Sequence, residues 1–221
     1  MNRTVTLIGA RGGQGTSTVA AALALHAADD LPTALLTHDP TATARILGAQ
    51  PPVAAEPFVA APNLTVAGLD ASPGTVTVID AGTVAANADR LVDDGVCYAV
   101  LRGPCYLALA TLVSSRHHRF DGVILVAEPG RALSAADASE VLGLPVVAIV
   151  PVRSRIARLI DAGLLAGRPS EISGLQHVRD ALVYGKEPAA AVLNARATGV
   201  GRATIRRGVS HDVGPDWEHA R

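Results

Sequence analysis

The residues best suited to chemistry form a glycine-rich stretch near the amino terminus, "GARGGQGTSTV" at positions 9–19. An apolar run precedes it and an Ala/Leu-rich run follows it, which is typical of a strand, a turn and a helix. Gly12, Gly13 and Gly15 permit a tight turn and the close approach of an anion. Backbone N–H groups and the partial positive charge of a helix N-terminus would surround that anion. We therefore expect this loop to bind a phosphate group.

Three further side chains have the chemistry that such a site requires. The Ser17 hydroxyl is placed to bind Mg²⁺. Asp80 follows four β-forming residues, where an acidic residue holds such an ion through water. Asp39 ends another β-rich run and is placed to orient a water molecule, although Asp before Pro is equally typical of a turn. Ser17 and Thr18 are also candidates for capping the helix, whether or not a metal binds.

These groups require elements that bring them together. Residues 4–8, 33–37 and 75–79 are apolar, β-rich runs, as buried parallel strands are. Residues 17–29 contain no Gly or Pro, which predicts a helix covered on both sides. Alternating strands and helices predict an α/β fold: a doubly wound, mostly parallel sheet with helices on both faces. In such sheets ligands bind beyond the carboxyl ends of the strands, where the polar clusters fall.

The rest of the chain continues this alternation. Further strands are expected at residues 64–67, 96–101, 122–127 and 144–152. Further helices are expected at residues 42–47, 84–93, 104–115, 134–141 and 155–165. Pro104 should lie in the first turn of its helix and Ser134 should cap the next one, whereas "GRP" at 167–169 should end the last. No long linker divides residues 1–184, and the Gly-rich, polar segment 185–221 is expected to be a flexible extension.

The composition excludes several classes of protein. The chain has 221 residues, enough for one α/β domain, with a net charge of −1, so no strongly basic nucleic-acid surface is evident overall. Aromatic residues make up only 3%, which leaves little surface for stacking on bases. The spacing of Cys97 and Cys105 fits neither a redox pair nor a zinc site. No secretory signal is evident, and the apolar stretch at 141–152 is too short for a membrane span. We expect a cytoplasmic protein.

Residues 11–18, "RGGQGTST", resemble the deviant Walker A motif of the ParA/MinD family of P-loop ATPases, K-G-G-x-G-K-[ST]-[ST]. Residues 37–40, "THDP", are similar to the D-x-D-P motif of that family, with only the second Asp retained as Asp39. Residues 76–82, "VTVIDAG", resemble its Walker B motif and match Asp80. The segment 150–165 is similar to one that contacts the base, although Arg153 stands where an Asp is expected. In all, the resemblance covers about residues 4–165.

The resemblance implies a three-layer P-loop NTPase fold over residues 1–184 and a site for ATP or ADP with Mg²⁺. The nucleotide-binding residues that it implies are Arg11, Gly12, Gly13, Gln14, Gly15, Thr16, Ser17 and Thr18. Arg11 matches a lysine that reaches across a nucleotide-sandwich dimer, and Thr16 matches the lysine that contacts the β- and γ-phosphates. Ser17 matches the hydroxyl that binds magnesium, with Asp80 as its acidic partner and Asp39 in the catalytic position.

The function implied is a nucleotide-binding switch or positioning protein that forms a homodimer and binds a protein partner. It would lie in the cytoplasm or peripherally at the membrane or nucleoid. Replacing lysine by Thr16 removes a charge-assisted hydrogen bond of roughly 1.5–3 kcal/mol, which weakens triphosphate binding about 10- to 100-fold. Hydrolysis should therefore be weak, with Arg11 as the candidate to compensate through its planar fork. The alternative is a pseudo-ATPase scaffold or localisation partner with a vestigial site.

Other interpretations stay open. The glycine loop is also typical of a plain strand–helix connection. It fits G-x-x-G-x-x-G of Rossmann-type reductases as well, with Asp39 on the ribose, although the catalytic Tyr-x-x-x-Lys pair is absent. His117-His118 is more typical of a solvated turn than of a metal pair. The segment 196–207 has four Arg and no acid, so contact with DNA or an anionic membrane is an alternative to solvated disorder.

Overall fold

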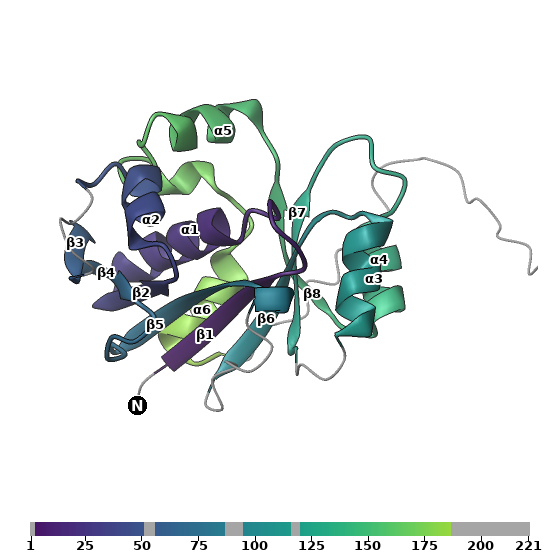
Figure 1. Cartoon of the computed structure of the whole chain (residues 1–221), viewed down its shortest axis with the longest axis horizontal. Helices are drawn as coiled ribbons and strands as arrows, with labels where there is room; N and C mark the ends of the chain where they lie inside the picture. Colours follow the sequence, from purple (N-terminus) through teal and green to yellow (C-terminus); the bar gives the residue numbers. More distant parts are fainter. Residues whose placement is uncertain (1–2, 51–55, 87–94, 116–119, 187–221) are drawn as a thin grey trace, which may run out of the picture.

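The computed structural model describes residues 3–50, 56–86, 95–115 and 120–186. Its centre is an eight-stranded sheet, and β1 (Arg3–Gly9) lies inside that sheet (Figure 1). The strand order is β3-β4-β2-β5-β1-β6-β7-β8. The other strands are β2 (Thr33–Thr37), β3 (Phe58–Ala61), β4 (Leu64–Gly68), β5 (Val76–Thr83), β6 (Val96–Gly103), β7 (Gly122–Ala127) and β8 (Val146–Pro151). All neighbours are parallel except the β3–β4 pair at one edge, which confirms the expected mostly parallel sheet.

Helices cover both faces of the sheet, as predicted (Figure 1). One face carries α1 (Thr16–Ala28), α2 (Pro40–Leu47), α5 (Ser154–Asp161), the 3₁₀ turn η2 (Pro169–Glu171) and α6 (Gln176–Tyr184). The other face carries η1 (Val84–Ala86), α3 (Tyr106–Ser114) and α4 (Ala135–Leu142). The result is a three-layer α/β arrangement around two apolar cores.

The sequence builds this arrangement from small apolar side chains. Residues of β6 alternate between the cores: Tyr98 and Val100 face α1, whereas Ala99 and Leu101 face α3. This is the period of two that a strand buried on both faces requires. α1 is buried along nearly its whole length between the sheet, α2 and α6, which explains why it is apolar all round.

Several sequence-based boundaries were wrong. Pro104 lies before Cys105, the N-cap of α3, rather than in the first turn of that helix. α5 ends at Asp161, not near residue 165, because Gly163 adopts a left-handed φ of 62° just beyond it. β5 runs on to Thr83, so Asp80 lies within the strand rather than after it. The sequence reasoning missed the short edge strand β3 and helix α6.

Other predictions fall on residues that the structure does not describe. Of the helix expected at 84–93, only the 3₁₀ turn η1 lies within the described part. His117-His118 and the Arg-rich segment at 196–207 lie outside the described residues, as does nearly all of the predicted extension from 185 onward. Across the described ranges, no helix is long and apolar enough to cross a membrane.

Candidate functional site

The glycine loop connects the carboxyl end of β1 to the first turn of α1, as the sequence predicted. Gly13 and Gly15 adopt left-handed φ values of 76° and 83°, whereas Gly12 does not require a glycine conformation. Gly15 is the N-cap of α1 and supplies no side-chain acceptor, so the predicted capping by Ser17 or Thr18 is wrong. The first N–H groups of α1 therefore have no side-chain cap, and an anion could accept from them.

Thr16 occupies the interior of this loop. It is only 7% exposed, and a Cβ atom added to Gly9 would overlap its hydroxyl oxygen. The same Cβ would lie 3.2 Å from the carbonyl oxygens of Arg11 and Gly82. The loop thus folds tightly over Gly9, and Thr16 presents no cation to a phosphate placed above it.

Gln14 ties the loop to the neighbouring strand β6. Its side-chain Oε1 accepts a 2.7 Å hydrogen bond from the backbone N–H of Arg102, and Gln14 is 9% exposed. The Arg102 guanidinium lies 3.5 Å from the carbonyl oxygen of Gly13. The buried side-chain amide of Gln14 therefore holds the glycine loop against β6. The sequence analysis predicted only a nucleotide contact for Gln14.

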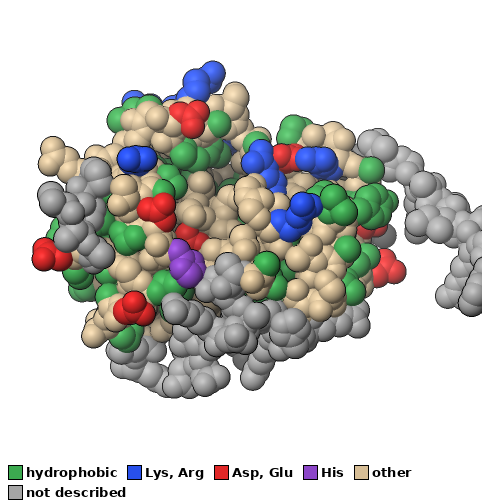
Figure 2. All heavy atoms as spheres, viewed as in Figure 1, with side chains coloured by type: hydrophobic (Ala, Val, Ile, Leu, Met, Phe, Trp, Pro, Cys, Tyr) green, Lys and Arg blue, Asp and Glu red, His purple; other side chains and the backbone are tan. Residues whose placement is uncertain are grey.

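A charge cluster that the sequence analysis missed adjoins the loop. Arg102 Nε donates to Glu128 at 2.7 Å, and Arg131 Nε donates to the other carboxylate oxygen of Glu128 at 2.7 Å. The hydrogen bond from Arg131, helped by the one from Arg102 and by the charges of both arginines, lowers the pKa of Glu128 below its usual value. In the space-filling view, basic and acidic side chains lie together near the upper centre of the visible face (Figure 2). Arg102 lies near the end of the apolar strand β6, and Glu128 and Arg131 follow β7, so only their proximity to the loop in space identifies them.

Asp80 lies on β5, directly beside the end of β2. It is 4% exposed, and its carboxylate accepts hydrogen bonds from Thr37 Oγ1 at 3.4 Å and from the backbone N–H of Gly82 at 3.1 Å. Within the part of the chain that the structure describes, Asp80 forms no ion pair. A buried carboxylate without a cationic partner is costly, and a divalent ion nearby would relieve that cost.

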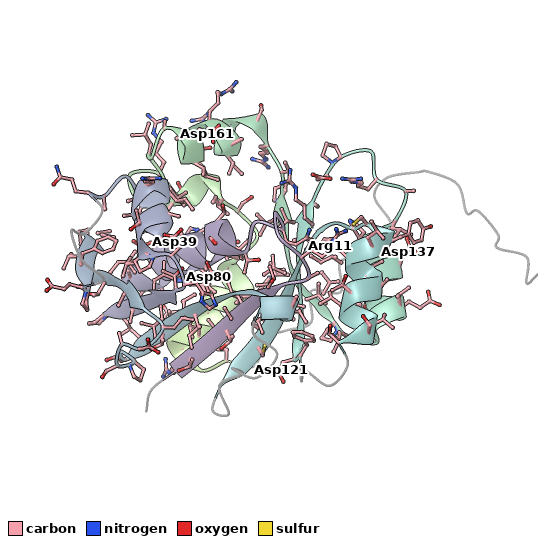
Figure 3. All side chains as sticks on the ribbon, viewed as in Figure 1. Arg11, Asp39, Asp80, Asp121, Asp137 and Asp161 are labelled. Carbon is pink, nitrogen blue, oxygen red and sulfur yellow. The ribbon has the colours of Figure 1, made fainter. Side chains whose placement is uncertain are left out.

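Asp39 has a clear local role. It is the N-cap of α2, and its Oδ1 accepts a 2.8 Å hydrogen bond from the backbone N–H of Ala42. It is exposed at the same edge of the sheet as Asp80, and Figure 3 shows both labels on one side of the α1 N-terminus with Arg11 on the other. Asp39 therefore caps α2 and remains accessible to solvent.

Not all predicted ligands are joined directly. No hydrogen bond links Ser17 to Asp80 among the described residues, and Arg11 is exposed at the tip of the loop. In the same ranges no three His, Cys, Asp or Glu side chains are grouped to hold a metal. A hydroxyl and a carboxylate are nevertheless the kinds of ligand that Mg²⁺ takes, since this ion keeps several waters and binds through few protein oxygens together with phosphate.

A pocket of about 140 Å³ lies between the start of α1 and the start of α5. Gly15, Thr18 and Arg102 line one side of it, and Arg153 lines the α5 side. Its remaining walls are mostly aliphatic: Val19, Val126, Val150, Pro151, Val152, Ala157, Ile156, Ile160 and Ile172. The late segment that the sequence analysis linked to a base thus lies beside the glycine loop.

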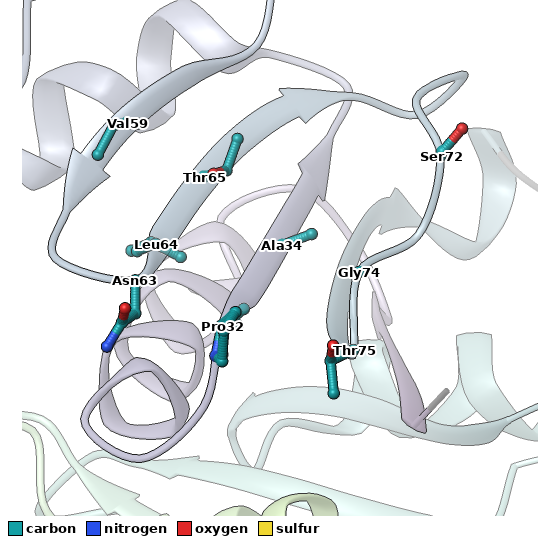
Figure 4. A pocket seen from close by; sticks show the side chains of 10 residues that line it. Pro32, Ala34, Val59, Asn63, Leu64, Thr65, Ser72, Gly74 and Thr75 are labelled. Carbon is teal, nitrogen blue, oxygen red and sulfur yellow. The ribbon is translucent and has the colours of Figure 1, made fainter. Parts of the chain in front are cut away.

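A second hollow, of about 430 Å³, lies at the other end of the strands (Figure 4). Its lining includes Thr33, Asn63 and Thr75 but no charged side chain. None of the residues predicted for the functional site lies there.

The strand order bears on the Rossmann interpretation. In the usual Rossmann sheet, the strands before and after the first helix are neighbours. Here β5 lies between β1 and β2, the strands that α1 connects. Asp80 of β5 therefore lies between the carboxyl ends of β1 and β2. The sheet does not have the Rossmann strand order, so the dinucleotide interpretation is wrong.

The structure is similar to solved structures of MinD and of ParA-family ATPases. It aligns with MinD of Pyrococcus horikoshii in complex with Mg-ADP at a TM-score of 0.62 and 17% identity, over 78% of this chain and 90% of that one. It aligns with the MinC:MinD complex of Aquifex aeolicus at a TM-score of 0.64 and 14% identity, over 84% and 96%. A ParA family ATPase of Chlorobium tepidum gives 0.57 and 13%, over 84% and 99%. No family model and no curated protein sequence matches the chain. The fold is therefore ParA/MinD-like, as the motifs predicted.

Proposed function

We propose that this chain, which has the fold of MinD and of ParA-family ATPases, binds a nucleoside triphosphate with Mg²⁺ and acts as a nucleotide-dependent switch or positioning protein. The observation that carries the proposal is the loop at the α1 N-terminus, with Gly13 and Gly15 in left-handed conformations, beside the buried carboxylate of Asp80. Backbone N–H groups would bind the phosphates.

Ser17 and Asp80 would hold Mg²⁺, with Asp80 acting through water. The ion, when bound, neutralises phosphate charge. The base would enter the aliphatic pocket beside α5, which Arg153 borders. ATP would be hydrolysed slowly, because Thr16 brings no cation to the loop and positive charge on the γ-phosphoryl is a main source of catalysis.

A thermal-shift titration with Mg·ATP and Mg·ADP tests nucleotide binding. We expect a saturable rise in melting temperature that is lost in Asp80→Asn and kept in Asp161→Asn, an exposed acid on α5. Thr16→Lys should raise the affinity for Mg·ATP. An equal rise in wild type and Asp80→Asn would remove Asp80 from the site.

A second candidate function is a scaffold with a vestigial site. The observation that favours it is the buried Thr16 hydroxyl, packed over Gly9 where a lysine would reach the phosphates. Under this alternative, no melting-temperature shift occurs at millimolar nucleotide, and partner binding does not depend on ATP.

The exposed Arg11 fits a role across a dimer interface. We expect light scattering to show a homodimer with a slowly hydrolysed ATP analogue, and Arg11→Ala to remain monomeric while it still binds nucleotide. A dimer that forms equally without nucleotide would contradict the switch.

A further inference from the structure

Thr16 leaves the glycine loop without the cation that binds nucleotide phosphates in the resembled motif. Two other basic side chains near the loop are poor replacements. Arg11 is exposed at the loop tip, and Arg153 is exposed on the α5 side of the pocket. Arg102 is exposed as well, but both its backbone and its guanidinium contact the loop: its N–H donates to Gln14, and Nη1 lies 3.5 Å from the Gly13 oxygen.

The fold directs Arg102 toward the start of α1. It follows Tyr98 and Val100 in the alternation of β6, and those two side chains pack in the core on the α1 face of the sheet. Arg102 lines the pocket together with Gly15 and Thr18. Its position at the carboxyl end of β6 therefore borders the place where the loop would hold phosphate.

The surrounding charges leave a net positive charge there. Glu128 is the shared partner of Arg102 and Arg131, so one carboxylate faces two guanidinium groups. The Arg102 side chain is 43% exposed, whereas that of Glu128 is 18% exposed. Glu128 engages Nε of Arg102 and Nη1 lies 3.5 Å from the Gly13 oxygen, so the outer N–H groups of the planar fork face the loop, where an oxyanion would bind. The backbone N–H of Glu128 donates to the Gly103 oxygen at 3.2 Å, which holds Glu128 against β6.

We propose that Arg102 donates hydrogen bonds to the phosphates of the bound nucleotide and supplies, from β6, the positive charge that Thr16 lacks. Glu128 orients the guanidinium and partly neutralises it. This inference rests on the nucleotide binding proposed above, and it assigns the phosphate contact to a residue far in sequence from the glycine loop.

The test is calorimetric titration of wild type and Arg102→Gln with Mg·ATP and with adenosine. We expect Arg102→Gln to lose about 10- to 100-fold in affinity for Mg·ATP, the effect of one charge-assisted hydrogen bond, with adenosine affinity unchanged. Arg102→Lys should lose less, because it keeps the charge but not the fork. Glu128→Gln should bind Mg·ATP more tightly than wild type.

Arg155→Gln is the matched control. Arg155 also pairs with a glutamate, Glu171, at 2.6 Å, and its replacement changes the net charge of the protein by the same amount. The affinity of Arg155→Gln for Mg·ATP should stay within about twofold of wild type, the range expected for a screened surface charge. Hydrogen exchange of the backbone amide at position 102 verifies that its hydrogen bond to Gln14 Oε1 survives in Arg102→Gln.

The outcomes separate the two proposals. Wild type that binds neither Mg·ATP nor adenosine would overturn the proposed function and this inference with it. Wild type that binds Mg·ATP, together with an Arg102→Gln variant of equal affinity, would overturn the inference alone. An equal loss for adenosine and Mg·ATP would also overturn it, because Arg102 would then act on the nucleoside and not on the phosphates.

Discussion

Thr37 Oγ1 donates a 3.4 Å hydrogen bond to Oδ2 of Asp80 across the neighbouring parallel strands β2 and β5, in which the two residues are register partners. The same oxygen accepts hydrogen bonds from the backbone N–H of Asp39 at 3.3 Å and from the hydroxyl of Thr43 at 3.4 Å. Thr37 therefore connects Asp80, Asp39 and α2. In the sequence, Thr37 stood out only because it replaces the first Asp of the D-x-D-P motif.

Thr37→Val should uncouple Asp80 from β2 while keeping the shape of the buried side chain. We expect a loss of about 1–3 kcal/mol in unfolding free energy, because a buried carboxylate oxygen loses its donor. In a double-mutant cycle with Asp80→Asn, measured by urea unfolding, the two changes should couple by more than about 0.5 kcal/mol. Thr33→Val is the control, since its hydroxyl donates to Leu31 O at the far end of β2. Additive effects for Thr37 and Asp80 would show that the hydrogen bond carries no energy.

Gly9→Ala should disturb the glycine loop through contact with Thr16. We expect destabilisation of about 1–3 kcal/mol from overpacking, and much of it should be recovered in the double variant with Thr16→Ala, which removes the overlapping oxygen. Calorimetric unfolding measures both. Gly12→Ala is the matched control, because an added Cβ there meets no atom within 4 Å and its φ is not left-handed. Equal losses at Gly9 and Gly12 would contradict the packing described for Thr16.

Asp39 is expected to act both as a cap and on the reaction, and two substitutions separate these roles. Asp39→Ala should lose about 1 kcal/mol of stability with the α2 cap, whereas Asp39→Asn keeps an acceptor for Ala42 and should be close to wild type. If the carboxylate orients the attacking water, Asp39→Asn should slow single-turnover ATP hydrolysis at least about tenfold while nucleotide affinity stays unchanged. Unchanged turnover in Asp39→Asn would leave the cap as its whole role.

The capping box of α4 should give a measurable pH dependence. The backbone N–H of Ser134, with the Ser134 hydroxyl, lowers the pKa of Asp137 below its ordinary value of 3.8. A lowered pKa contributes stability that is complete above the unfolded-state value and is lost as the pH falls through the folded-state value. Asp137→Asn should therefore be less stable than wild type at neutral pH, with the difference shrinking below about pH 4. Urea unfolding of wild type and Asp137→Asn between pH 3 and 7 measures the difference, and a difference that stays constant down to pH 3 would contradict the role of the Asp137 carboxylate.

The sequence determined the features that depend on neighbouring residues. Buried runs of β-forming residues predicted β1 and β2, glycine spacing predicted the loop, and the absence of Gly and Pro predicted α1 within one residue of its bounds. These features follow from local backbone preferences and from the periodicity of apolar side chains. The alternation of strands and helices then restricted the fold to a parallel sheet with its polar clusters at one edge.

The tertiary structure decided what surrounds those clusters. It placed β5 between β1 and β2, which brings Thr37 onto Asp80, and it brought Arg102 and Glu128 to the glycine loop from strands far along the chain. It also turned the Thr16 hydroxyl inward over Gly9. Strand order and side-chain packing arise from contacts between distant segments, and local spacing carries no information about which strand ends meet.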